Sequence, residues 1–208
     1  MHIHFTIEVQ CENTEPSRVV PRIEGKIFEF AGDDDNEVEI GKIGGYLVLV
    51  GRAFDEEESL FDAMDSIDQS VHDCYAALFN PDNADELWSE SVRALYSDNV
   101  SAMNVLFIQT IELYPNLASI EIAPIIRETI ATFGSECGIV ACRAPDNVKV
   151  WTDLGFRKMP DSDFYTYAPQ LLNQMEKDDE PAPDASWSNR VRRGRRRLAR
   201  SARGQTLT

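Results

Sequence analysis

The stretch that decides the fold begins with the run Asn104-Val-Leu-Phe-Ile-Gln-Thr-Ile-Glu-Leu-Tyr-Pro115. A helix-like segment then covers residues 124–133 and is stopped by Gly134, and a second apolar run, Cys137-Gly-Ile-Val-Ala-Cys142, follows it. The stretch closes with a short connection and Trp151-Thr-Asp-Leu-Gly-Phe156. Two apolar strands joined by one helix predict a parallel βαβ unit. The junction between the first strand and the helix is where such units bind phosphate groups.

The residues on either side of this stretch add strands and helices to the same domain. Apolar patterning predicts strands over residues 5–10, 23–30 and 38–50, and the third is apolar enough at its end to be central in a sheet. Residues 163–167 predict a last strand, and a capping box at residues 83–86 predicts the start of a helix. Apolar residues at steps of three and four predict one further helix with a single buried face, formed by Leu60, Met64, Ile67, Val71, Cys74 and Leu78.

Three glycines, Gly41, Gly44 and Gly45, lie within the strand predicted over residues 38–50. A phosphate-binding glycine loop would be followed by a Lys-Ser pair or by the start of a helix, and the sequence has neither at this point. We therefore interpret these glycines as a bulge or bend in the strand.

The order and spacing of these features resemble the GNAT superfamily of acyl-CoA-dependent N-acetyltransferases. The matching features are Leu113-Tyr-Pro115 at the end of a long strand, a helix ending in Phe133-Gly134, the strand Gly138-Ile-Val-Ala, and Leu154-Gly-Phe156. Residues 59–79 also lie where the family places its early helices, so the resemblance covers most of residues 1–170. It implies an α/β (α+β) fold with a mixed, mostly antiparallel sheet, a parallel βαβ core unit and helices on both faces.

The resemblance also implies acetyl-CoA or another acyl-CoA as the cofactor, held in a notch between two splayed parallel strands. In the family, backbone amides of a glycine-containing loop hold the pyrophosphate at a helix start. The positions that match here are Leu113 on the strand and the loop residues Ala118, Ser119, Ile120, Glu121, Ile122 and Ala123. No glycine lies between Asn116 and Phe133, and Glu121 replaces the central one. Two like charges about 6 Å apart at an effective dielectric of about 20 repel by about 3 kcal/mol, so this loop is a degenerate pyrophosphate site.

Two residues match the catalytic positions of the family. Trp151 stands where the family has a tyrosine that acts as general acid toward the departing thiolate, and an indole has no proton to transfer at useful pH. Glu112 lies on the strand that carries Leu113, where many members have a glutamate base; the alternative is an outward residue on a half-buried strand. These departures leave two hypotheses open: an N-acyltransferase with a diverged site, or a GNAT-shaped protein that has lost catalysis and works by binding.

The composition divides the 208 residues into a domain over residues 1–172 and a linker with a basic, disordered tail over residues 173–208. The 36 acidic residues all lie before Ala185, whereas eight of the 20 basic residues are arginines from Arg190 onward.

The four cysteines have no CxxC spacing and are interpreted as reduced, mostly buried thiols. The first residues do not form a signal peptide, and no apolar run reaches the ~20 residues of a membrane span, so we expect a cytoplasmic protein with no membrane association.

The charge distribution suggests partners of two kinds. The acidic body suits a cationic amine or a basic peptide as acceptor. The run from Arg190 to Arg203 is either a solvated tail that contacts the acidic body or a segment that binds nucleic-acid phosphates. His2 and His4 lack an evident third ligand, so no metal site is predicted.

Overall fold

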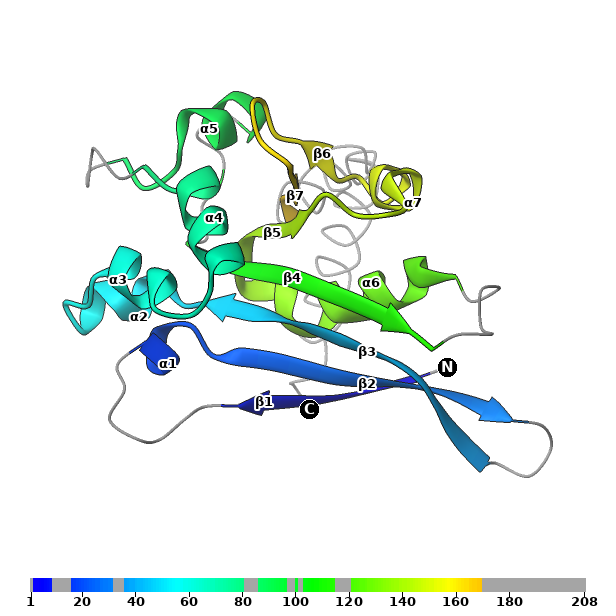
Figure 1. Ribbon diagram of the computed structural model, residues 1–208. Helices are drawn as coiled ribbons and strands as arrows, with labels where there is room; N and C mark the ends of the chain where they lie inside the picture. The colour runs from blue at the N-terminus through cyan, green and yellow to red at the C-terminus, as the bar shows by residue number, and fades with distance from the viewer. Residues whose placement is uncertain are drawn as a thin grey trace, which may run out of the picture. The chain divides into compact units, whose positions relative to one another are not determined.

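A computed structural model describes residues 2–8, 16–31, 36–80, 86–96, 100, 103–114 and 121–169, all within one compact unit, Met1–Leu171 (Figure 1). Its centre is a seven-stranded sheet with the order β1-β2-β3-β4-β5-β7-β6. Within the described residues β4 and β5 pair in parallel and every other neighbouring pair is antiparallel. The strands are β1 His2–Glu8, β2 Arg22–Ala31, β3 Asn36–Val48, β4 Asn104–Leu113, β5 Cys137–Arg143, β6 Arg157–Lys158 and β7 Phe164–Tyr167. The mixed, mostly antiparallel sheet with a parallel βαβ unit is confirmed.

Helices cover both faces of this sheet, as Figure 1 shows. On one face, α1 to α5 pack on a buried cluster that includes Val48, Val105 and Phe107. On the other, α6 and α7 pack on a second cluster that includes Leu106 and Ile108. The helices are α1 Pro16–Val19, α2 Val50–Asp55, α3 Leu60–Asp65, α4 Gln69–Leu78, α5 Glu90–Tyr96, α6 Ile122–Phe133 and α7 Val148–Asp153, and a 3₁₀ turn, Gly134–Glu136, follows α6.

The apolar runs of the sequence become the two central strands. Side chains of β4 alternate between the two buried clusters up to Ile108, and all residues of β5 except the last are buried. A strand covered on both faces needs apolar residues at successive positions, which explains the unbroken run from Cys137 to Cys142.

The prediction of a single helix over the periodic residues 60–78 is wrong. The structure breaks it into α3 and α4 at Ser66, Ile67 and Asp68. Asp68 is extended and its carboxylate accepts a hydrogen bond from the Val71 amide, so it caps a new helix where the apolar pattern runs on without interruption.

The predicted capping box lies largely outside the described residues, and the helix does not begin there. Residues 86–89 are not helical, and α5 begins at Glu90. Trp88 instead forms an isolated antiparallel bridge with Phe79, and their rings stack 5.4 Å apart. This bridge and the aromatic stack keep Trp88 in an extended conformation, so the helix begins only after it, at Glu90.

The interpretation of the glycines as a bulge in β3 is confirmed beside Gly41: Ile27 pairs with Gly41 but Phe28 pairs with Glu39, so Ile40 is an extra residue in β3. At Gly44 and Gly45 the irregularity lies in the partner strand instead. Gly44 pairs with Thr110 but Gly45 pairs with Ile108, so Gln109 is an extra residue in β4. A side chain at Gly45 would come within 2.1 Å of the Phe107 carbonyl oxygen. Glycine is therefore required where the two backbones approach most closely.

Candidate functional site

The candidate site lies where β4 and β5 separate, and we call it the β4–β5 opening. The parallel pairing ends at Ile108 and Cys142, although β4 continues to Leu113. Beyond that point each strand stays with its antiparallel neighbour: β4 with β3, up to the pair of Gly41 and Leu113, and β5 with β7. The backbone edge of β4 after Ile108 consequently has no partner strand on the β5 side among the described residues.

The end of β5 and the residue after it are hydrogen-bonded to the segment around β7. Ala144 adopts a left-handed conformation with φ of 28°, and its amide donates to the Asp163 carbonyl at 2.7 Å. Arg143 pairs with Phe164 of β7. The space between the strands is a pocket of about 350 Å³.

The two walls of the opening differ in polarity because the extra residue Gln109 reverses the alternation of β4. Ile108 before the bulge and Ile111 after it both contact the cluster beneath α6 and α7. The apolar wall consists of Ile108, Ile111, Ile122, Cys142 and Trp151. Gln109, Thr110, Glu112, Arg143, Asp146 and Asn147 supply the polar groups of the pocket. A ligand with an apolar arm and a polar reacting end fits this division.

Two side chains of the polar wall are held by α4. Gln109 donates from Nε2 to Asp68 at 3.1 Å, and Arg143 donates from Nη1 to Asp73 at 2.7 Å. A hydrogen bond from Gln69, together with the Arg143 guanidinium, lowers the pKa of Asp73 below its ordinary value, although desolvation opposes this. Asp73 therefore remains a carboxylate at every pH at which an ordinary aspartate is ionised.

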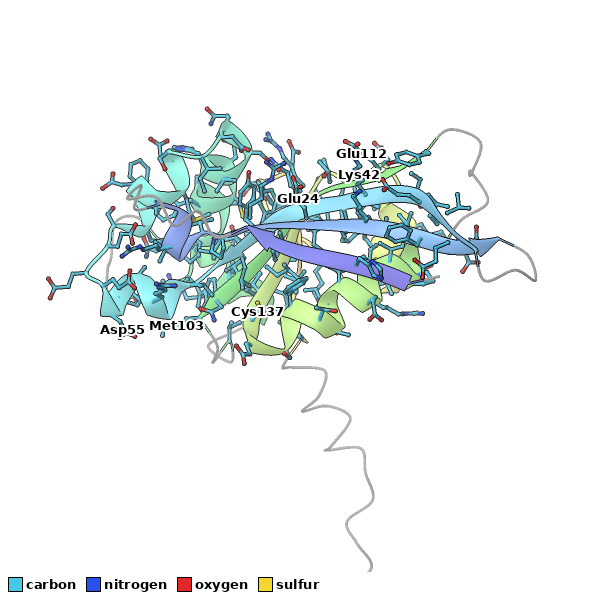
Figure 2. All side chains as sticks on the ribbon, turned by 90° about the horizontal axis from the view of Figure 1, so that it is seen from below. Glu24, Lys42, Asp55, Met103, Glu112 and Cys137 are labelled. Atoms are coloured by element: carbon cyan, nitrogen blue, oxygen red, sulfur yellow. The ribbon has the colours of Figure 1, made fainter. Side chains whose placement is uncertain are left out.

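The structure brings three of the residues predicted from the sequence together in this pocket. Glu112, Ile122 and Trp151 all line it. Trp151 is 4% exposed and packs edge-on against Phe156, with ring centroids 4.8 Å apart. Glu112 is exposed and lies opposite Lys42 across β3 and β4, so the outward orientation and the place at the pocket are both observed (Figure 2).

The other predicted residues lie elsewhere or outside the described residues. Leu113 is half-buried against the cluster beneath α6. Glu121 is exposed at the N-cap of α6 and its side chain forms no capping hydrogen bond, while Ala123 is half-buried in the first turn. The predicted loop positions Ala118, Ser119 and Ile120 lie outside the described residues.

Sequence reasoning missed the residues that form most of the polar wall. Gln109 and Thr110 interrupt an otherwise apolar strand, and Arg143 directly follows the second apolar run. A polar break at the same end of two neighbouring parallel strands is a signal that could have located the opening, because parallel strands end at the same edge of a sheet.

Comparison with family models, curated proteins and solved structures gave no match. In the part of the chain that the structure describes, no helix is long and apolar enough to cross a membrane. The same residues contain no group of three or more His, Cys, Asp or Glu side chains arranged to hold a metal ion.

The thiol of Cys142 on the apolar wall is expected to stay unreactive. Burial raises the pKa of Cys142 and of Cys74 well above the ordinary range, and it raises that of Cys137 to about 12. Since the thiolate is the nucleophile, iodoacetamide at mildly alkaline pH should leave all three unmodified in the native protein. Peptide mass spectrometry after labelling, with and without denaturant, measures this. Modification of Cys142 in the native protein would show that the thiol is accessible through the pocket.

Proposed function

We propose that the protein is a GNAT-like, acyl-CoA-dependent N-acyltransferase of low turnover that binds its acyl thioester in the β4–β5 opening. The observation that carries this proposal is the separation of two parallel strands beside a pocket with one apolar wall. The order of strands around the parallel pair is consistent with the fold that the sequence resemblance implies.

The chemistry of coenzyme A suits the opening. Its pantetheine arm carries two amides, which can hydrogen-bond as an added strand would to the backbone edge of β4 after Ile108, an edge with no partner strand on the β5 side in the described part of the chain. The acyl chain and the methylene groups can lie on the apolar wall formed by Ile108, Ile111, Ile122, Cys142 and Trp151. Burying each methylene group there contributes about 0.8 kcal/mol.

The polar wall supports a cationic amine as the acceptor. Glu112 and Asp146 line the pocket, and the charge of Arg143 is balanced by Asp73. The carboxylates would attract a protonated amine, and in this proposal Glu112 accepts its proton before the amine attacks the thioester carbonyl. The attack forms an amide bond and breaks the carbon–sulfur bond. The nitrogen gives up its second proton to solvent as the thiolate leaves, and the thiolate then takes a proton from solvent.

Calorimetric titration with coenzyme A, acetyl-CoA and pantetheine tests this proposal. Binding of all three at micromolar to submillimolar concentration is expected, with pantetheine retaining most of the affinity because the opening holds that arm. Absence of heat with millimolar acetyl-CoA would refute the proposed ligand.

Filling the apolar wall should block the site without unfolding the protein. Ile122 lines the pocket from the first turn of α6 and is only half-buried, so Ile122→Trp can place its larger ring in the opening. The Kd for acetyl-CoA is expected to rise at least about tenfold, which corresponds to about 1.4 kcal/mol. Ala131→Trp is the matched control, because Ala131 is exposed on the same helix and does not line the pocket. Equal affinities in the two variants would place the ligand outside the opening.

A second candidate function is a binding protein without catalysis, and Glu121 favours it. Its exposed carboxylate stands at the N-cap of α6, where the partial positive charge of a helix would otherwise favour phosphate. In this alternative the run from Arg190 to Arg203, which lies outside the described residues, contacts nucleic acid or an acidic partner. Salt-dependent binding to duplex DNA that disappears on truncation after Asp184, without any affinity for acetyl-CoA, would support it over the enzyme.

A further inference from the structure

Helix α4 connects both strands that flank the β4–β5 opening. Its N-cap residue Asp68 contacts Gln109 in the bulge of β4, and Asp73 contacts Arg143 at the end of β5. Strands β4 and β5 form no further pair beyond Ile108 and Cys142 among the described residues. The helix therefore supplies a link between the strands at the point where their own hydrogen bonds stop.

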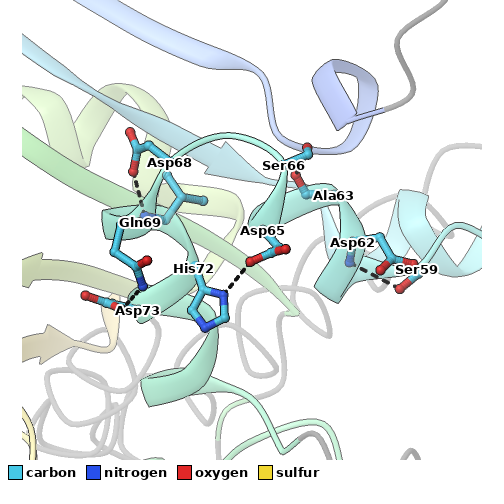
Figure 3. Close-up of polar contacts among 10 residues, drawn as sticks. Ser59, Asp62, Ala63, Asp65, Ser66, Asp68, Gln69, His72 and Asp73 are labelled. Carbon is cyan, nitrogen blue, oxygen red and sulfur yellow. Dashed lines mark hydrogen bonds and ion pairs between the residues drawn. The ribbon is translucent and has the colours of Figure 1, made fainter.

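Each of the two carboxylates divides its oxygens between the helix and a strand. Asp68 accepts from the Val71 amide with Oδ1 at 2.9 Å and from Gln109 with Oδ2 at 3.1 Å. Asp73 accepts from Gln69 with Oδ1 and from Arg143 with Oδ2, both at 2.7 Å. Figure 3 shows the helix half of this arrangement, with Gln69 bonded to Asp73 and Asp68 bonded to the start of α4. Because one oxygen of each carboxylate is fixed to the helix, the other is held in a defined position for the strand.

We infer that Asp68 and Asp73 are positioning residues that form a clasp across the β4–β5 opening, setting the separation of the strands and the placement of Gln109 and Arg143 in the polar wall. Neither aspartate lines the pocket, whereas Gln109 and Arg143 both do. Arg143 is further oriented by the Phe164 ring, whose centroid lies 5.9 Å from the guanidinium carbon. The clasp thus acts on the site through the two residues that it holds.

The double variant Asp68→Asn, Asp73→Asn breaks the clasp and leaves the helix intact. The single oxygen of an asparagine at position 68 can keep the capping bond to Val71, and that of an asparagine at position 73 can keep the bond from Gln69. The amide group of each side chain then faces another donor, Gln109 in the first case and Arg143 in the second. Glu56→Gln is the matched control, because Glu56 forms an ion pair of 2.8 Å with Arg52 on α2 away from the opening. It makes the same carboxylate-to-amide change without touching the clasp.

Hydrogen exchange of the ligand-free protein measures the clasp directly. Peptides covering residues 105–113 and 139–146 are expected to exchange about fivefold faster in the double variant than in the wild type or in Glu56→Gln. Peptides from the β2–β3 hairpin are expected to exchange at the wild-type rate, because a general loss of stability would accelerate them as well. Unchanged exchange around the opening would overturn the inference, and so would equal acceleration throughout the sheet.

The effect on ligand binding rests on the proposed function and is measured separately. The Kd for acetyl-CoA is expected to rise about threefold to tenfold in the double variant and to stay unchanged in Glu56→Gln. Faster exchange at the opening in a protein that never binds acetyl-CoA supports the clasp and refutes the proposed function. Unaltered acetyl-CoA binding with unaltered exchange refutes the clasp and leaves the proposed function standing.

Discussion

Replacing Gly45 with alanine is expected to lower the free energy of unfolding by about 3 kcal/mol. The added methyl carbon would lie 2.1 Å from the Phe107 carbonyl oxygen, 3.1 Å from the Phe107 carbonyl carbon and 3.2 Å from the Ile108 Cα atom. All three are backbone atoms of β4, so no side chain can rotate away to make room. The strands must separate beside the bulge, which breaks hydrogen bonds in the centre of the sheet. Urea denaturation followed by circular dichroism measures the change.

Gly51→Ala is the control for this substitution. The nearest atom to a methyl group at Gly51 is the Met103 Cε atom at 3.8 Å, an ordinary contact with a flexible side chain. Gly51 is helical within α2, where alanine is favoured over glycine by up to about 1 kcal/mol. Gly51→Ala should therefore be neutral or slightly stabilising. Equal stability of the two variants would show that β3 and β4 can move apart at the bulge without cost.

The parallel unit at the centre of the fold could be predicted because its signals are local. The runs beginning at Asn104 and Cys137 are apolar at successive positions, and Gly134 ends the helix between them. A strand that is buried on both faces of the sheet requires that pattern, so the apolar composition of each run indicates a central, doubly covered strand.

The break between α3 and α4 could not be predicted from apolar periodicity. Met64, Val71, Cys74 and Leu78 are all buried in the same cluster, so the spacing of an uninterrupted helix is preserved across two helices. The deciding feature is Asp68, which caps α4 and also reaches Gln109 of β4, 41 residues later. That second contact exists only after the sheet has formed, and one sequence read by itself does not contain it.

Only part of the candidate site could be predicted from the sequence, because its position also depends on long-range contacts. The family resemblance points to Glu112, Ile122 and Trp151, and all three line the pocket. The opening itself results from two long-range pairings, β3 with β4 and β5 with β7, which continue after β4 and β5 have separated. The polar breaks at Gln109 and Arg143 indicate the opening only when β4 and β5 are known to be parallel neighbours, so neither strand read by itself predicts the polar wall.

Trp151 is expected to have a large structural role that can be distinguished from a chemical one. The side chain is 4% exposed and packs on Phe156, and replacing a buried tryptophan with alanine costs about 3–5 kcal/mol. Trp151→Ala should therefore be strongly destabilised in urea. Trp151→Phe and Trp151→Tyr keep an aromatic ring against Phe156, so both should retain most of the stability and allow the chemistry to be compared.

The phenylalanine and tyrosine variants differ by a single phenolic hydroxyl at the wall of the opening. In the proposed reaction the departing thiolate needs a proton, which the indole of Trp151 does not supply. A positioned general acid contributes about 10²-fold or more to the rate, so Trp151→Tyr is expected to transfer acetyl groups to a polyamine about 10²-fold faster than Trp151→Phe. Trp151→Phe should match the wild-type rate, because neither side chain donates a proton. Release of free thiol from acetyl-CoA, followed with a chromogenic disulfide, gives the three rates under identical conditions. Equal rates in all three proteins would show that the thiolate is protonated by another group and that Trp151 contributes packing alone.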